Sequence, residues 1–474
     1  MKKSYLIFII FINILFMIIF REDYVFYILP ITISLFLLLK LIDDSMKSGG
    51  TIFHPLPMAC FILAISVVMA PAISSGLQVY LLSAPRSINW DKWLGILSWL
   101  YLLGIILFYL SCRLFLNNKS FQYSLDIELH KKNFILVSFL FLFLSLISQI
   151  LVFQKFGGVI SYMTKWTEDR SDFDGLGIWY MFAEPFPMIF LIFLILLIGK
   201  DKLKNSIIYL SIIFLIFFVL KMLFGGFRGS RSNTIWGLYW FAGIVHLYIY
   251  RLKKIHYIVG ILFLTIFMST YALYKSYGVD AFSGDYSVTE TNRYQNNPLL
   301  DIYLGDFSRA TINAYQISQI SDLSNYEEKY GQTYLSSASK FFPPIKYFYS
   351  GHDKNSAGSE IVNNIKINPQ VEEYHNSRVF GIYGEAILNF GIFFGIFSFF
   401  FVGFFVSKLD NYCRSSANKS VFIFIIPFLS NMAITLILSD SDNIVFFVFK
   451  NGLLVFLYLY FISIFCVKGY KYVR

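Results

Sequence analysis

The chain has 474 residues, of which 57% are hydrophobic and 20% aromatic, whereas only 14% are charged. An ordinary soluble domain carries about 25% charged residues, so the composition excludes that class and predicts an all-α polytopic membrane protein. The formal net charge of +10 comes mostly from basic residues between the apolar runs. Basic residues in such connections indicate how a chain is oriented in the membrane. No nucleic-acid partner is therefore expected.

Apolar runs long enough to cross a bilayer follow one another along the chain. A hydrocarbon core of about 30 Å requires roughly 20 apolar residues in a helix, and lipid offers no partner to open backbone groups, so the runs are predicted to be helices. The first run has no small-residue cleavage site before Arg21, and we interpret it as a retained helix rather than a signal peptide. The twelve runs cover approximately residues 4–20, 24–42, 54–73, 93–113, 133–153, 178–199, 206–224, 234–250, 255–275, 383–406, 420–438 and 444–466.

The distribution of lysine and arginine predicts the orientation. With both termini cytoplasmic, 20 of these residues fall in inner connections and 8 in the short outer connections, as the positive-inside rule requires. The expected organisation is transmembrane helices one to nine in residues 1–275, a large, mainly helical outer-face loop in 276–382, and helices ten to twelve in 383–474.

Ionisable residues inside the predicted spans lie in the outer half of the membrane. Glu184 is about six residues below the outer surface, in a helix that Pro185 and Pro187 must bend. Lys221 and Lys450 also lie below the outer ends of their spans. Such residues are candidate functional groups, because an unpaired charge in lipid is costly. The alternatives are an internal ion pair between Glu184 and one lysine, or substrate binding in a hydrated cavity that opens outward.

The stretch 224–233 joins spans seven and eight at the outer face and reads Phe-Gly-Gly-Phe-Arg-Gly-Ser-Arg-Ser-Asn. Its glycines allow a sharp turn and a close approach to a ligand, and the planar guanidinium groups of Arg228 and Arg231 match two phosphate oxygens at once. Ser232 or Asn233 is predicted to cap span eight, so the N-terminus of that helix points into the same space. The stretch predicts a pyrophosphate cradle, with binding of lipid headgroups as the alternative.

The outer connections supply further polar candidates. Residues 165–172 form a charged run with Arg170, on the same face as the arginine stretch, although most such runs are simply solvated. Residues 300–317 follow helical spacing, with apolar residues on one side and Arg309 among the polar residues on another, which is also typical of a solvated face. A turn-rich segment later in the loop contains His352, most simply a surface histidine.

The start of span ten gathers more candidates. His375 and Arg378 come just before it, and Glu385 and Asn389, four residues apart, share one helix face. Gly391 is expected to allow close packing against a neighbouring helix.

No metal cluster is predicted. Asp440 and Asp442 lie in the short turn between spans eleven and twelve. Binding of a cation is the alternative there, but a turn or helix-cap role is the usual one for aspartate. The large outer loop contains no cysteine, hence neither a disulfide framework nor a thiol nucleophile. No cofactor is expected.

Many spans, one large outer loop late in the chain, and two short motifs together resemble a known family. The motifs are Gly226-Phe227-Arg228-Gly229-Ser230-Arg231, and Gly384-Glu385-Ala386 with Asn389-Phe390-Gly391. They are similar to those of bacterial O-antigen and oligosaccharide repeat-unit polymerases of the Wzy type. The resemblance implies a GT-C-like, metal-independent membrane glycosyltransferase of the bacterial cytoplasmic (inner) membrane, with its large loop periplasmic or extracellular.

The resemblance also implies a reaction. Such enzymes transfer the growing glycan from undecaprenyl pyrophosphate to the sugar of an incoming lipid-linked repeat unit, for O-antigen (lipopolysaccharide) or capsule. They work in membrane lipid, with a chain-length regulator and a flippase as expected partners. By resemblance, Arg228 and Arg231 bind the donor pyrophosphate.

Lipid pyrophosphate is already a good leaving group, so the reaction needs charge stabilisation by arginine rather than a general acid. A base must still take or orient the proton of the acceptor hydroxyl. Glu385 is our first candidate for that base, followed by His375 and His352. The candidate residues for binding pyrophosphate or glycan are Arg228, Arg231, Arg378, Arg309, Arg170, Glu184, Lys221 and Asn389.

Two other functions compete with this one. An O-antigen ligase, which moves the finished glycan to a lipid acceptor, shares the topology and the use of arginine. A flippase or transporter of lipid-linked oligosaccharide should have charged or broken helices near the membrane midplane and often internal repeats. Here the deep polar residues are predicted near one face and no repeat is evident, so we prefer the polymerase.

Overall fold

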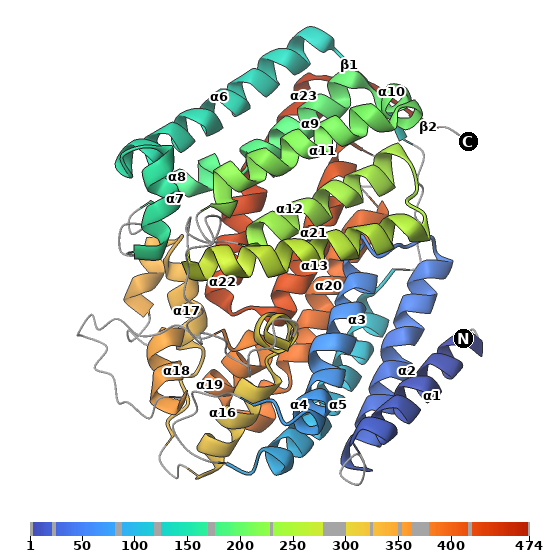
Figure 1. Ribbon diagram of the computed structural model, residues 1–474, viewed down its shortest axis with the longest axis vertical. Helices are drawn as coiled ribbons and strands as arrows, with labels where there is room; N and C mark the ends of the chain where they lie inside the picture. Colours follow the sequence, from blue (N-terminus) through green and yellow to red (C-terminus); the bar gives the residue numbers. More distant parts are fainter. Residues whose placement is uncertain are drawn as a thin grey trace. The chain divides into compact units, whose positions relative to one another are not determined.

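The α-helices and β-strands of the computed structural model are labelled in Figure 1. The chain forms two compact units, each built from separate segments of the sequence. The first unit comprises Met1–Lys119, Asn292–Asn411 and Met432–Phe446, and the second comprises Ser120–Thr291, Tyr412–Asn431 and Phe447–Arg474. The structure describes residues 3–20, 25–80, 88–117, 125–168, 176–227, 231–277, 300–322, 326–348, 353–362, 379–415 and 420–472.

Nine helices within the described residues are long and apolar enough to cross a membrane, so the chain is a multi-pass membrane protein. A further pair, α19 (Gly381–Gly395) and α20 (Ser398–Ser415), meets the same test when taken together, but bends by 108° at the break between the two helices. The nine are Phe26–Lys47, Pro55–Gly76, Trp90–Phe115, Lys131–Lys155, Gly177–Ile198, Ile207–Gly226, Lys254–Tyr271, Val421–Leu438 and Ser441–Phe465.

Two of the twelve predicted spans are helical without being among these nine. They are α1 (Lys3–Phe20), and α12 (Arg231–Ile244) followed by the π-helical turn η5 (Val245–Ile249). The prediction of twelve spans is therefore not confirmed in number.

The span predicted at 383–406 is not one continuous helix. The chain turns between α19 and α20, and α19 is itself interrupted at Gly391, whose φ of 74° lies in the left-handed region. Glycine adopts this conformation without a steric penalty. Gly391 thus changes the direction of the backbone, whereas the sequence suggested a helix-packing role.

In the first unit, glycines let helices approach closely. Gly104 of α5 (Trp90–Phe115) lies against the ring of Phe399 of α20. A Cβ on Gly403 would lie 2.8 Å from the carbonyl oxygen of Phe108 on α5. Such small residues are typical of tightly packed membrane helices. The other N-terminal elements of this unit are α2 (Val25–Lys47), α3 (Pro55–Leu63), η2 (Ala64–Met69) and α4 (Ala70–Gly76).

The described part of the large loop from residue 300 onward belongs to the first unit and is helical, as expected. The prediction that the polar face of residues 300–317 is solvated is wrong, because Asn313 is 1% and Gln316 0% exposed. Their side-chain amides donate to the carbonyl oxygens of Phe380 (3.2 Å) and Gly384 (3.5 Å), so this face packs on the start of α19. The loop elements are η6 (Asp301–Phe307), α16 (Ala310–Asp322), α17 (Gln332–Ser339), η7 (Pro343–Phe348) and α18 (Lys354–Val362).

In the second unit, the bend predicted from Pro185 and Pro187 is confirmed. α8 (Gly177–Ala183) ends before Glu184, and α9 (Phe186–Ile198) begins after Pro185. The ring of Phe186 stacks on Phe224, with centroids 4.6 Å apart. The neighbouring elements of this unit are α6 (Lys131–Lys155), α7 (Val159–Glu168), α10 (Lys200–Asn205), α11 (Ile207–Lys221), the π-helical turn η4 (Met222–Gly226) and α13 (Lys254–Tyr277).

The C-terminal part of the chain contributes segments to both units. Its elements in chain order are η9 (Val421–Ile425), α21 (Ile426–Leu438), α22 (Ser441–Phe447), the π-helical turn η10 (Val448–Leu453) and α23 (Leu454–Phe465).

The all-α prediction missed one small antiparallel sheet in the second unit. Strand β1 (Leu125–Leu129) pairs with β2 (Val467–Tyr472), with Ile127 opposite Tyr470. β1 alternates apolar with acidic residues, which suits a strand, whereas the alternation in β2 is interrupted at Lys468 and Gly469, where the register shifts. The pairing joins segments more than 300 residues apart, and local periodicity alone does not reveal it.

Candidate functional site

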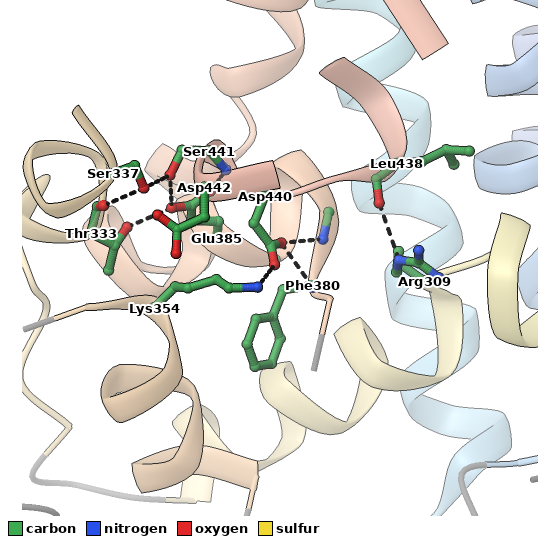
Figure 2. Close-up of polar contacts among 12 residues, drawn as sticks. Arg309, Thr333, Ser337, Lys354, Phe380, Glu385, Leu438, Asp440, Ser441 and Asp442 are labelled. Carbon is green, nitrogen blue, oxygen red and sulfur yellow. Dashed lines mark hydrogen bonds and ion pairs between the residues drawn. The ribbon is translucent and has the colours of Figure 1, made fainter. Parts of the chain in front are cut away.

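Glu385, the first candidate for the base, lies near the start of α19 and is 0% exposed. Figure 2 shows the contacts of its carboxylate. Oε1 accepts hydrogen bonds from Thr333 Oγ1 (2.8 Å) and Ser441 Oγ (2.5 Å), and Oε2 accepts one from the Ser441 backbone N–H (2.6 Å). Elements distant in sequence, α17, α19 and α22, therefore hold one carboxylate.

Asp440 forms a second buried carboxylate site beside the first. Its Oδ2 lies 2.6 Å from Lys354 Nζ, and the two side chains are 0% and 4% exposed. Its Oδ1 accepts from the backbone N–H groups of Phe380 (2.9 Å) and Gly381 (2.8 Å) (Figure 2). Burial raises the pKa of the Asp440 carboxyl, and the Lys354 ammonium opposes that effect.

Each of the two carboxylates binds the N-terminus of the helix at which the other one lies. Asp440 immediately precedes α22 but binds N–H groups at the start of α19, whereas Glu385 of α19 binds the first N–H of α22. N–H groups in the first turn of a helix have no partner within it and carry partial positive charge. Each carboxylate therefore stabilises the start of the other's helix. The predicted cap role of Asp440 is confirmed, and the helix that it caps is α19.

Asn389 lies on the same face of α19 as Glu385, as predicted. Its Nδ2 donates to the Glu385 carbonyl oxygen (2.9 Å) and to Thr333 Oγ1 (2.7 Å), and its Oδ1 accepts from the Gly331 N–H (3.0 Å). The amide thus orients the Thr333 hydroxyl toward Glu385. The predicted contact of Asn389 with substrate stays a prediction.

An apolar cavity of about 290 Å³ lies in the bend between α19 and α20, with one wall from α17. Two lining residues, Tyr334 and Ala386, directly follow Thr333 and Glu385 in sequence. The cavity and the Glu385 contacts therefore lie on the same two helices. The lining residues are Tyr334, Ile382, Ala386, Phe390, Phe394, Phe397, Ser398 and Phe401.

Arg309 precedes α16, and its guanidinium binds main-chain carbonyl groups. Nε donates to Leu438 O (3.2 Å), as Figure 2 shows, and Nη1 donates to Gly305 O and Ser308 O (both 2.9 Å). It also lines a cavity of about 20 Å³ with Asn313, which is large enough for one water molecule. The predicted contact of Arg309 with substrate stays a prediction.

In the second unit, Glu184 lies at the centre of a buried polar chain. Its Oε1 is 2.6 Å from Lys450 Nζ, and its Oε2 accepts from Asn233 Nδ2 (2.7 Å). Asn233 Oδ1 in turn accepts from Lys221 Nζ (2.9 Å). The ion pair foreseen for Glu184 is confirmed with Lys450. The predicted cap role of Asn233 is wrong, because α12 already begins at Arg231 and the Asn233 side chain is used in this chain of contacts.

All three ionisable groups of this chain lie at irregularities in helices. Glu184 stands between α8 and α9, Lys221 directly precedes η4, and Lys450 lies within η10. π-Helical turns of this kind occur frequently at functional sites. The second unit therefore has a candidate polar site of its own.

The remaining predicted site residues lie outside the described part of the chain, apart from the backbone of Arg231. They are Arg170, Arg228, Arg231, His352, His375 and Arg378.

Within the described ranges, no group of three or more His, Cys, Asp and Glu side chains could hold a metal ion. No protein-family model, curated protein or solved structure matches the chain. Its fold and site thus define a multi-pass helical membrane protein with a buried carboxylate cluster.

Proposed function

We propose that the chain polymerises oligosaccharide repeat units linked to undecaprenyl pyrophosphate, at the outer face of the bacterial cytoplasmic membrane. It transfers the growing glycan from its lipid pyrophosphate to the acceptor sugar of an incoming repeat unit, as do the Wzy-type enzymes that it resembles. Glu385 is the proposed base for the acceptor hydroxyl, and Arg228 and Arg231 are the proposed ligands of the pyrophosphate.

The observation that carries this proposal is the position of a buried carboxylate cluster beside an apolar cavity in one unit. Glu385 and Ala386 are consecutive on α19, yet one binds hydroxyl groups and the other lines the cavity. A lipid-linked sugar likewise joins a polar reacting end to a hydrocarbon chain. Ligand sites commonly combine a mainly apolar pocket with a few convergent polar groups, and this arrangement favours a lipid-linked substrate.

The chemistry needs few groups. The acceptor oxygen forms a bond to the anomeric carbon of the donor glycan, the bond from that carbon to the pyrophosphate oxygen breaks, and the electron pair leaves with the pyrophosphate. Guanidinium groups stabilise the departing negative charge. The acceptor proton goes to a carboxylate, and general-base catalysis of this kind contributes typically about 10²–10⁴-fold in rate.

The central prediction concerns the reaction itself. The purified full-length protein in proteoliposomes, given only lipid-linked repeat units, is expected to produce a ladder of longer lipid-linked glycans, which gel electrophoresis or mass spectrometry would resolve. A wild-type protein that leaves verified, intact substrate unextended contradicts the polymerase assignment.

The arginine stretch gives a second prediction. Arg228→Lys and Arg231→Lys are each expected to lower polymerisation by roughly ten-fold or more, because lysine cannot make the bidentate contact that guanidinium makes with phosphate oxygens. Arg113→Lys is the control, since Arg113 pairs with Asp44 in the other unit. Initial rates are compared at equal amounts of folded protein. Near-normal rates for both Arg228→Lys and Arg231→Lys would contradict the proposal that these arginines bind the pyrophosphate.

A specific observation favours the transporter as the second candidate. Glu184, Lys221 and Lys450 lie at broken or π-helical segments, and discontinuous helices with ionisable residues are typical of transporter sites. The same proteoliposomes separate the two functions: a flippase makes labelled lipid-linked substrate accessible on the opposite leaflet without extending it. A ligase would instead require a separate lipid acceptor.

A further inference from the structure

The groups around Glu385 differ in their access to substrate. Glu385, Thr333 and Ser337 are buried, whereas Ser441 is half-buried. The Ser441 hydroxyl lies 2.5 Å from Glu385 Oε1 and 2.6 Å from Ser337 Oγ. Among these four side chains, a substrate can therefore reach Glu385 most directly through Ser441.

The hydrogen-bond count shows that this cluster can accept one more proton. Four contacts need a proton each: Thr333 Oγ1 to Glu385, Ser441 Oγ to Glu385, Ser441 Oγ to Ser337 Oγ, and Ser337 Oγ to Thr333 O. Three hydroxyl groups supply only three protons, since each serine or threonine donates one. When Glu385 takes a proton, it donates to Ser441, Ser441 donates to Ser337, and all four contacts are satisfied.

The other contacts of Glu385 do not change when the proton arrives. Oε2 still accepts from the Ser441 backbone N–H, and Thr333 is still oriented by Asn389 Nδ2. The carboxylate is thus held in one position in both states. Prealigned groups of this kind need no rearrangement during the reaction.

We propose that the Ser441 hydroxyl carries the proton of the acceptor sugar to Glu385. This inference rests on the polymerase function proposed above. The acceptor O–H donates to Ser441 Oγ, which receives its proton while the serine's own proton moves to Glu385 Oε1. The acceptor oxygen bonds to the anomeric carbon, and the pyrophosphate leaves with the electron pair. Glu385 ends as a carboxylic acid and returns its proton to solvent by the same path. Ser441 is then the catalytic residue that touches the acceptor, and Thr333 and Asn389 are positioning residues.

Two substitutions at Ser441 test the proposal. Ser441→Ala removes the hydroxyl but keeps the backbone N–H that binds Glu385 Oε2, so the carboxylate retains two of its three donors. Its kcat for glycan extension is expected to fall by about 10²-fold or more, with little change in the donor KM. Ser441→Thr keeps the hydroxyl and is expected to recover most of the rate that Ser441→Ala loses.

Ser339→Ala is the matched control. Ser339 lies on α17 like Thr333, is also buried, and its hydroxyl donates to the Ser336 carbonyl oxygen (2.7 Å). In the part of the chain that the structure describes, the Ser339 hydroxyl does not contact Glu385, so its removal should leave kcat near that of wild type. Thermal unfolding in detergent checks that every variant is folded.

Rates in mixtures of H2O and D2O distinguish proton transfer from packing. Two protons move in the proposed step, so the wild-type kcat should depend on the deuterium fraction along a curve; a straight line means that one proton moves and overturns the relay. A Ser441→Ala variant as fast as wild type, or a Ser441→Thr variant as slow as Ser441→Ala, also overturns it. Each of these outcomes contradicts the relay through Ser441 but not the polymerase function. A wild-type protein that makes no ladder contradicts both the relay and the polymerase function.

Discussion

Replacement of Asp440 by asparagine is expected to destabilise the protein by about 3–5 kcal/mol, the usual effect of removing one partner from a buried ion pair. The asparagine oxygen can still accept from the N–H groups of Phe380 and Gly381, but its NH₂ group would face the buried Lys354 ammonium. The uncompensated cation is the physical cause. The free energy of unfolding can be followed by detergent-based denaturation of the full chain.

Two further variants separate this cause from a general loss of packing. The double variant Asp440→Asn with Lys354→Met removes the stranded cation and should recover a large part of the stability. Asp442→Asn, two residues further on in α22, is the matched control, because the partner of Asp442 is Lys340, whose side chain is 36% exposed and can return to water. The Asp442 side chain is itself buried, but its replacement leaves no cation buried, so its effect should be clearly smaller than that of Asp440→Asn. Equal losses for Asp440→Asn and Asp442→Asn would contradict the assignment.

Local patterns predicted much of this fold. Apolar runs of sufficient length gave the membrane helices, since lipid forces the backbone to satisfy its own hydrogen bonds. Pro185 predicted the break before α9, because proline cannot continue the hydrogen bonds of a helix. Glu184 and Lys450 were candidates for an ion pair because isolated charges in lipid are costly, and the structure pairs them.

The parts of the site that the sequence did not predict depend on contacts between distant segments. Thr333, Lys354 and Ser441 were not candidates, and each is an ordinary hydroxyl or basic residue in its local sequence. Their roles follow from contacts with Glu385 or Asp440 across 52, 86 and 56 positions of the chain. The available signal was the Asp440-Ser441-Asp442 turn, which was interpreted as a cap.

The bend between α19 and α20 was missed for a related reason. The residues from 381 to 415 are apolar enough for one span, and hydropathy does not report direction. Gly391, where α19 itself is kinked, was assigned only a helix-packing role, although glycine serves both close helix packing and left-handed backbone conformation. The choice between them is made by the surrounding structure: the carbonyl oxygens of Leu388 and Asn389 accept from the backbone N–H groups of Lys329 and Tyr330.

Replacement of Glu385 by glutamine is expected to stop glycan extension while donor binding survives. The amide can keep its place, because its oxygen can accept from the Ser441 N–H while its NH₂ group donates to the hydroxyl oxygens of Ser441 and Thr333. It cannot take up a proton at neutral pH, however. The loss in kcat should therefore reach about 10²–10⁴-fold, the range of general-base catalysis.

Initial rates of ladder formation and direct binding of the lipid pyrophosphate donor measure the two parts of this prediction. Glu360→Gln is the control, since Glu360 lies in the same unit and its carboxylate pairs with Lys329 (2.8 Å) rather than with the groups around Glu385 in the described residues. It should extend glycans at the wild-type rate. A fully active Glu385→Gln variant would transfer the role of base to His375 or His352. A variant that is inactive and also fails to bind donor would show that Glu385 supports the site rather than the proton transfer.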